Sequence, residues 1–375
     1  MDEETRLIKT RPDWQIALAI TGALRVFYSA IAAALSFVLH PAPSLVHSNA
    51  LTENLPSPGT WHYALLGIWG RFDTLWYLRI AARGYDLASS VVFYPLYPAT
   101  IRLLTPVFGD IASALIVSTI SAYLFFWGVI RLIGSEFPGI SPLRTLALIA
   151  AWPASFYLFA GYSEAPAMAM VVWCILFGRE ERWIAATACA CAAGLTRSMG
   201  TLLIVPLLVL AARSRRIGAW AVLLSPVGTL SYWIWLRSTG RLSIAMAYSR
   251  YWNTQVAAPW TTLGRAANSI VRYPDSLLAI SFVTLVLFAL AGVIARRRLE
   301  DRALSAAVIL HLLLRSCVPP LLGTPRYLLP AYPAFLSMGN WLQETRAARF
   351  FLLCSLLFLF NLVWMAAFLK WSLVL

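Results

Sequence analysis

The sequence predicts an all-α polytopic membrane protein, a bundle of about eleven transmembrane helices, on three observations. Of its 375 residues, 60% are hydrophobic and only 12% are charged. Apolar runs fill almost the whole length, and several approach the roughly 20 residues that a helix needs to cross a bilayer. No polar stretch is long enough to fold as a soluble domain, so a single membrane domain over residues 1–375 is expected.

The third observation is the distribution of charge. The formal net charge is +14, yet the basic residues form short clusters between apolar runs instead of one patch, which argues against a nucleic-acid partner. The main clusters lie at residues 6–11, 179–182, 213–216, 296–302 and 346–349. This spacing is typical of cytoplasmic loops that follow the positive-inside rule.

The apolar runs define the expected elements in chain order. Spans are predicted at residues 14–39, 111–133, 143–160, 161–178, 183–197, 200–212, 217–237, 276–295, 303–322, 326–342 and 350–370. One more apolar segment, Phe93–Gly109, contains Arg102 and three prolines. With the basic N-terminus placed in the cytoplasm, a crossing by this segment would put all later basic clusters outside, against the positive-inside rule. The segment is therefore predicted to lie along the membrane interface. Residues 40–110 then form one large extracytoplasmic loop with in-plane helices, and residues 238–275 form a second outer loop.

This topology gathers the unusual polar segments on the outer face, opposite the basic clusters. They are Asp73, the GYSE turn at Gly161–Glu164, the LTRSMG turn at Leu195–Gly200, and TPRYLLP at Thr324–Pro330. The sequence therefore predicts an extracytoplasmic site at the membrane surface.

Asp73 is the candidate catalytic residue. It begins a predicted short helix that runs to about Arg83, and at helical spacing it shares a stripe with Trp76 and Tyr77. A partly desolvated carboxylate beside aromatic rings suits general-base work on a sugar hydroxyl, with Tyr77 as a substrate contact. Aspartate is also a preferred N-cap residue, and the two roles are compatible.

Glu164 is the second candidate carboxylate and lies between two apolar runs, next to Tyr162 and Ser163. A carboxylate there is either a helix-start residue favoured by the helix dipole or a ligand contact that faces a cavity. The neighbouring hydroxyls favour the ligand contact, with Tyr162 and Glu164 as substrate-binding residues.

Arg197 and Arg326 are the outer-face arginines most tightly embedded in apolar sequence. The positive-inside rule gives no reason for either, and a guanidinium matches a phosphate in a bidentate geometry. A structural ion pair with Glu164 or Asp73 is the alternative. Three further ionisable residues, Arg25, His311 and Arg315, fall inside predicted spans with no acidic partner there, which makes a poor proton relay.

The sequence contains no glycine-rich phosphate loop, nucleophile elbow or HExxH motif. Its five cysteines lie in or at the ends of apolar runs, and its aspartates are sparse. No metal or cofactor is expected.

Five motifs in fixed order resemble the PIG-V family, which comprises GPI mannosyltransferase II and its bacterial relatives within the GT-C class. They are RFDTLWYLRIAARGYD, FYPLYP, PASFYLFAGYSEA, GLTRSMG and PRYLLPAYP, between about residues 69 and 335. The resemblance implies a GT-C fold whose first large outer loop carries the catalytic aspartate, matched here by Asp73. It also implies that Tyr162–Glu164, Arg197 and Arg326 lie near the site.

The chain departs from the family pattern in two places. Phe72 stands where the family commonly has tryptophan before the aspartate, and Met199 replaces an asparagine. These changes leave the expected fold intact but bear on the identity of the acceptor.

The resemblance implies a glycosyltransferase that moves a sugar, mannose by analogy, from a polyprenyl-phosphate donor. The acceptor would be a lipid-linked or cell-surface glycan, and many enzymes of this class invert the anomeric centre. A multi-pass protein of a bacterial cytoplasmic membrane, surrounded by membrane lipids, is expected. The alternatives are a lipid or glycolipid transporter or flippase, which should show midplane polar residues and an internal repeat, and a non-catalytic scaffold.

Overall fold

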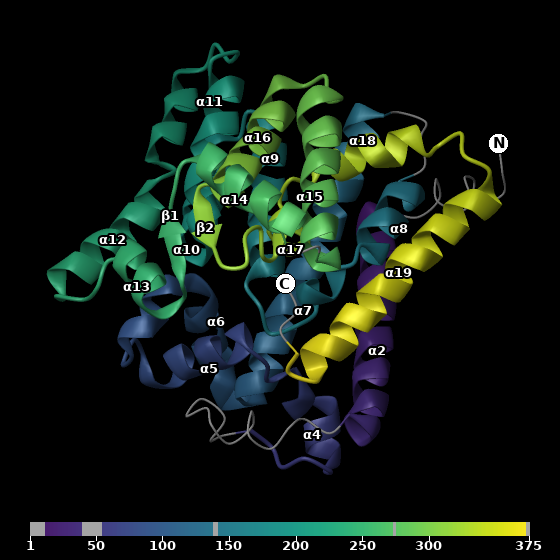
Figure 1. Cartoon of the computed structure of the whole chain (residues 1–375). Coiled ribbons are helices and arrows are strands. Elements are labelled where there is room, and N and C mark those ends of the chain that lie inside the picture. The colour runs from purple at the N-terminus through teal and green to yellow at the C-terminus, as the bar shows by residue number, and fades with distance from the viewer. Residues whose placement is uncertain (1–11, 40–54, 138–141, 273–274, 373–375) are drawn as a thin grey trace. The chain divides into compact units, whose positions relative to one another are not determined.

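Figure 1 shows a computed structural model of the chain, which describes residues 12–39, 55–137, 142–272 and 275–372. Among these residues, five helical segments are long and apolar enough to cross a membrane. They are Asp13–Val38, Asp110–Glu136, Ile217–Ser238, Ser276–Ile294 and Ala347–Leu369. The helical membrane class is therefore confirmed, while the number of eleven spans stays a prediction. The basic cluster at residues 6–11 and residues 40–54 of the expected outer loop lie outside the described part.

The chain divides into two compact units. Unit 1 comprises Met1–Gly84, Tyr97–Ala169 and Trp341–Val374, and unit 2 comprises Tyr85–Leu96, Met170–Asn340 and Leu375. Each unit thus combines segments that are far apart in the sequence.

Unit 1 is built on long helices that buried polar side chains join. Its elements are α2 (Asp13–Val38), α4 (Trp61–Leu65), η1 (Gly67–Trp69), α5 (Asp73–Arg83), α6 (Leu96–Phe108), α7 (Asp110–Glu136), α8 (Leu143–Ala151), η3 (Ser155–Leu158), the start of α9 (Glu164–Arg179) and α19 (Ala347–Leu369). Helices α2 and α7 pack against each other. The Tyr28 hydroxyl in α2 donates to Asn361 Oδ1 in α19 over 3.1 Å, and Asn361 Nδ2 donates to the Trp152 carbonyl over 2.6 Å.

The predicted span at residues 143–160 is wrong in its length. Helix α8 ends at Ala151, and a 3₁₀ turn at Ser155–Leu158 follows before α9 begins. The cause is Pro153, since the residue before a proline is pushed out of the helical region. Trp152 accordingly has a ψ of 136°.

Unit 2 contains shorter helices and one small sheet. Its elements are η2 (Ala88–Val92), the rest of α9, α10 (Trp183–Thr196), η4 (Ser198–Leu203), α11 (Ile204–Ala211), η5 (Ile217–Leu224), α12 (Val227–Ser238), α13 (Ile244–Tyr251), β1 (Thr254–Val256), α14 (Pro259–Arg272), α15 (Ser276–Phe288), the π-helical turn η6 (Ala289–Ile294), α16 (Leu299–Leu313), β2 (Arg315–Cys317), α17 (Thr324–Tyr327) and α18 (Pro333–Trp341).

Three predictions about unit 2 need correction. The span predicted at 326–342 is interrupted, because α17 ends at Tyr327 and α18 begins only at Pro333. The expected span at 303–322 ends early, because α16 stops at Leu313 and the chain continues as β2. Strand β2 pairs antiparallel with β1, with Val256 opposite Arg315. The expected loop at 238–275 therefore contains α13, β1 and α14. Its strand β1 is the pairing partner of β2. Arg315 lies in a strand and not inside a membrane helix.

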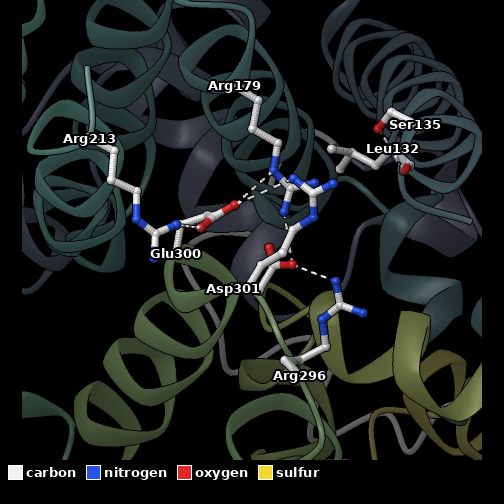
Figure 2. Close-up of polar contacts among 8 residues, drawn as sticks. Leu132, Ser135, Arg179, Arg213, Arg296, Glu300 and Asp301 are labelled. Atoms are coloured by element: carbon white, nitrogen blue, oxygen red, sulfur yellow. Dashed lines mark hydrogen bonds and ion pairs between the residues drawn. The ribbon is translucent and has the colours of Figure 1, made fainter. Parts of the chain in front are cut away.

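Three basic loops meet at one end of unit 2. Arg179, the last residue of α9, donates to Glu300 over 3.2 Å and to Asp301 over 2.8 Å at the start of α16. Arg213, after α11, reaches Glu300 over 3.3 Å (Figure 2). This meeting agrees with the prediction that these clusters lie on one side of the membrane.

Arg197, one of the two predicted outer-face arginines, and Arg315 lie at the other end of unit 2. Helices α10 and α16 both begin at the basic loops, with 14 and 15 residues respectively. Arg197 follows the far end of α10, and Arg315 lies just beyond the far end of α16. At ~1.5 Å per residue, they are about 20 Å from the loops.

Gly200 allows η4 to lie directly on α10. A Cβ atom there would be 2.2 Å from the Ala193 carbonyl carbon and from the Gly194 nitrogen. Gly200→Ala should therefore lower the free energy of unfolding by about 1–3 kcal/mol, because backbone atoms cannot give way as a flexible side chain can. Thermal unfolding in one detergent checks this. The control Gly134→Ala, in α7 with nothing within 4 Å of its Cβ position, should be neutral or stabilising. Equal unfolding temperatures for the two variants would contradict the expectation.

Candidate functional site

Asp73 is the first residue of α5, which ends at Arg83 as the sequence predicted. The N-cap position belongs to Phe72, so the N-cap interpretation of Asp73 is wrong. Phe72 has a φ of 45°, a conformation that bulky residues rarely adopt. Its ring is held against Phe368 and Trp371, with centroids 5.6 and 5.2 Å away. Strain of this kind persists only where surrounding packing enforces it, and it gathers at functional sites.

The start of α5 rests on the Gly161–Glu164 turn within unit 1. The Asp73 backbone N–H, one of the helix's first-turn donors, donates to the Tyr162 hydroxyl over 3.3 Å. The Tyr77 hydroxyl lies 2.7 Å from Ser163 Oγ. Tyr162 and Tyr77 are buried, whereas Asp73 keeps part of its surface exposed. The structure thus brings together Asp73, Tyr77 and the turn that the sequence identified separately.

Gly161 makes this contact close. A Cβ atom at this position would lie 2.6 Å from Thr74 Cγ2, so a larger residue requires the Thr74 side chain or the start of α5 to move. Thr74 itself is fully buried. The glycine therefore permits the close approach of α5 to the turn.

Buried hydroxyl groups of α6 and α7 hold the Gly161–Glu164 turn in place. The Tyr97 hydroxyl donates to the Ala114 carbonyl over 3.0 Å and lies 2.9 Å from Ser118 Oγ. Ser118 in turn donates to the Tyr162 carbonyl over 3.2 Å. Burial raises the pKa of Tyr97 above its ordinary value, and the negative charge of Glu164 raises it further. Tyr97 therefore stays a neutral hydrogen-bond donor.

Glu164 is the first residue of α9 and is 4% exposed. The helix-start interpretation is confirmed, because a carboxylate in the first turn is stabilised by the helix dipole. Its expected role as a substrate contact stays a prediction.

Arg71 is a positioning residue that the sequence did not single out. It is 1% exposed, and its Nε donates to the Leu369 carbonyl over 2.8 Å. Its Nη2 donates to the Tyr63 hydroxyl over 2.6 Å, and its guanidinium lies 5.0 Å from the Trp371 ring centroid. These contacts anchor the chain immediately before Phe72 and Asp73. The only available signal was an arginine two residues ahead of the candidate aspartate.

Arg25 has a structural explanation. Its Nη1 donates to the Phe159 carbonyl over 2.5 Å, and its guanidinium lies 5.2 Å from the Trp69 ring centroid. A carbonyl and an aromatic face thus stabilise this charge in α2.

Three arginines of unit 2 gather around one aromatic ring. The guanidinium carbons of Arg315, Arg197 and Arg326 lie 4.1, 5.4 and 5.4 Å from the Tyr327 ring centroid. We call these three residues and Tyr327 the basic cluster. Arg197 and Arg326, the two predicted phosphate contacts, are therefore neighbours, and Arg315, which was expected inside a span, is a third member.

Hydrogen bonds of the residues next to Arg197 and Arg315 hold the basic cluster in place. Ser198, next to Arg197, lies 3.0 Å from His311 Nε2 in α16. Arg265 in α14 donates to Ser316 Oγ over 2.5 Å, next to Arg315 in β2. Arg326 is 8% exposed, while Arg197 and Arg315 keep more of their surface. Because a guanidinium matches a phosphate in a bidentate geometry, the basic cluster is the candidate anion site of unit 2.

Comparison with known proteins gives no relative: no family model, curated protein or solved structure matches the chain. Membership of the PIG-V family stays a prediction that rests on the order of the five motifs. Among the described residues, no three His, Cys, Asp or Glu side chains gather so that they could hold a metal ion.

Proposed function

We propose that this protein is a membrane glycosyltransferase that moves a sugar, mannose by analogy with the PIG-V family, from a polyprenyl phosphate to a glycan acceptor. The acceptor is lipid-linked or part of the cell surface, and the reaction takes place on the extracytoplasmic face. Asp73 is the general base, and the basic cluster binds the donor phosphate.

The chemistry needs a base and an anion site. Asp73 takes the proton from the acceptor hydroxyl while that oxygen attacks the anomeric carbon, which inverts its configuration. The bond from the anomeric carbon to the phosphate oxygen breaks, and the polyprenyl phosphate leaves with the electron pair. Arg197, Arg315 and Arg326 stabilise the negative charge that develops on it. Tyr77, Tyr162 and Glu164 position the acceptor.

The observation that carries this proposal is the contact between the start of α5 and the Gly161–Glu164 turn. Three candidate residues from two separate stretches of the chain, Asp73, Tyr77 and Tyr162, lie together there. The strained Phe72 directly precedes the partly exposed carboxylate. Strain is retained where function depends on the geometry that it produces.

Replacing the arginines of the basic cluster tests the anion site. In membranes that express the chain, supplied with radiolabelled polyprenyl-phosphate mannose, Arg197→Gln and Arg315→Gln should each lower kcat/KM for the donor by about tenfold or more. The reason is the loss of a hydrogen bond to a charged group, which contributes about 1.5–3 kcal/mol. Scintillation counting of the extracted glycans measures the transfer.

Arg250→Gln is the matched control, since Arg250 is an exposed arginine of α13 in the same unit. It should transfer as the wild type does. If Arg250→Gln and the cluster variants lose activity equally, phosphate binding by the cluster is wrong. If the wild type consumes no donor at all, the glycosyltransferase proposal fails and the transporter alternative gains support.

A further inference from the structure

A second polar site lies at the opposite end of unit 2 from the basic cluster. It is an open cavity of about 230 Å³ where α9, α10, α11 and α16 begin or end. Its lining includes Arg179, Arg213, Arg298, Glu300 and Trp183. Figure 2 shows Arg179, from α9, and Arg213, from the turn after α11, converging on Glu300. The volume is below the roughly 300–1,000 Å³ of sites for drug-sized ligands, as suits a small headgroup.

The residues that line this cavity carry positive charge in excess, with Arg179, Arg213 and Arg298 against Glu181 and Glu300. Arg179, Arg213 and Arg298 pair with Glu300, and Arg179 and Arg296 pair with Asp301. Glu300 and Asp301 are 2% and 0% exposed, so these carboxylates hold the guanidinium groups in place from the protein side. The Arg213 and Arg298 side chains keep 57% and 40% of their surface exposed. A fixed, partly exposed excess of positive charge attracts an anion.

The apolar surface beside the cavity indicates a lipid and not a soluble anion. Ile184, next to the lining residue Trp183, is 83% exposed, and Ile217, at the start of η5, is 89% exposed. Exposed branched side chains of this size contact acyl chains when a membrane surrounds them. Basic pockets between helix ends bind the headgroups of anionic lipids.

We propose that this cavity binds the phosphate headgroup of an anionic membrane lipid. The lipid phosphate lies near Arg213 and Arg298, and its acyl chains lie along the apolar surface marked by Ile184 and Ile217. This site is separate from the proposed glycosyltransferase chemistry and does not depend on it.

Lipid binding to the full-length purified chain tests this proposal. Native mass spectrometry in a neutral detergent gives the Kd for dioleoyl phosphatidylglycerol and for dioleoyl phosphatidylcholine. The wild type should bind phosphatidylglycerol more tightly. Arg213→Gln and Arg298→Gln should each weaken that binding about fivefold, the effect of one basic residue at an anionic surface. Inorganic phosphate, added as a competitor, should not displace the lipid at equal concentration.

Arg215→Gln is the matched control, because Arg215 is exposed and two residues from Arg213 but does not line the cavity. It should bind phosphatidylglycerol as the wild type does. The proposal is overturned if Arg215→Gln weakens binding as much as Arg213→Gln, or if the wild type does not distinguish the two lipids. Displacement by inorganic phosphate at equal concentration would identify a soluble-anion site instead. Unfolding temperatures of the variants establish that each is folded, and two separate arginines keep the test open if one variant is unstable.

Discussion

Asp73→Asn should abolish most sugar transfer and leave the protein folded. Asparagine keeps the size of the side chain but cannot accept the proton of the acceptor hydroxyl. Because a positioned general base contributes about 100- to 10,000-fold to a rate, kcat should fall by that factor. The measurement is transfer from radiolabelled polyprenyl-phosphate mannose in membranes with matched expression. The backbone N–H of Asp73 still donates to Tyr162 in the variant, so the contact that holds α5 on its turn remains.

Asp110→Asn separates catalysis from a helix-dipole effect. Asp110 is also the first residue of its helix, α7, and is also partly exposed. Neutralising Asp73 or Asp110 removes a comparable favourable interaction between the carboxylate and its helix dipole. Asp110→Asn should therefore keep wild-type transfer. If both variants transfer at the wild-type rate, Asp73 is not the base, and Glu164 is the next carboxylate to replace.

Asp301→Asn should destabilise the protein more than any other single charge removal in unit 2. Asp301 is completely buried, and its Oδ2 accepts from Arg179 over 2.8 Å and from Arg296 over 2.5 Å (Figure 2). Arg296 is itself 4% exposed, so asparagine would remove the negative charge of Asp301 from beside a buried guanidinium. Removing one partner of a buried ion pair costs about 3–5 kcal/mol. Thermal unfolding in detergent should show a clear drop in transition temperature.

Glu180→Gln provides the comparison at the same end of unit 2. Glu180 pairs with Arg182 over 3.4 Å, and the Arg182 side chain is 59% exposed. An exposed pair of this kind contributes about 0–1 kcal/mol, so the unfolding temperature should hardly change. Equal shifts for Asp301→Asn and Glu180→Gln would show that the buried pairs do not stabilise the fold as argued.

Local patterns in the sequence predicted the helices well where one helix spans one apolar run. Helices α2, α7, α10 and α19 lie within a few residues of their predicted bounds, and α5 begins at Asp73 as expected. Hydropathy and helical spacing depend on neighbouring residues alone, so a single sequence carries them. The candidate carboxylates and arginines were found for a similar reason, since a charge within apolar sequence is conspicuous.

The sequence did not reveal where β2 interrupts the span predicted at 303–322. That segment is apolar enough for a helix, but it pairs with β1 about sixty residues earlier, and a strand pairing between distant residues leaves little local signal. Arg315 was consequently assigned to the membrane interior, and its place beside Tyr327 was missed.

The sequence by itself determined the membrane class, the order of the helices, the basic loops and the candidate site residues Asp73, Glu164, Arg197 and Arg326. Only the tertiary structure decided which of them meet: Asp73 with Tyr162 in unit 1, the three arginines around Tyr327 in unit 2, and Glu300 with the arginines of separate basic loops. The physical reason is the distance in the sequence over which each property is determined. Burial and helix formation are set by each residue and its near neighbours, whereas these sites depend on contacts between segments that are brought together only by packing.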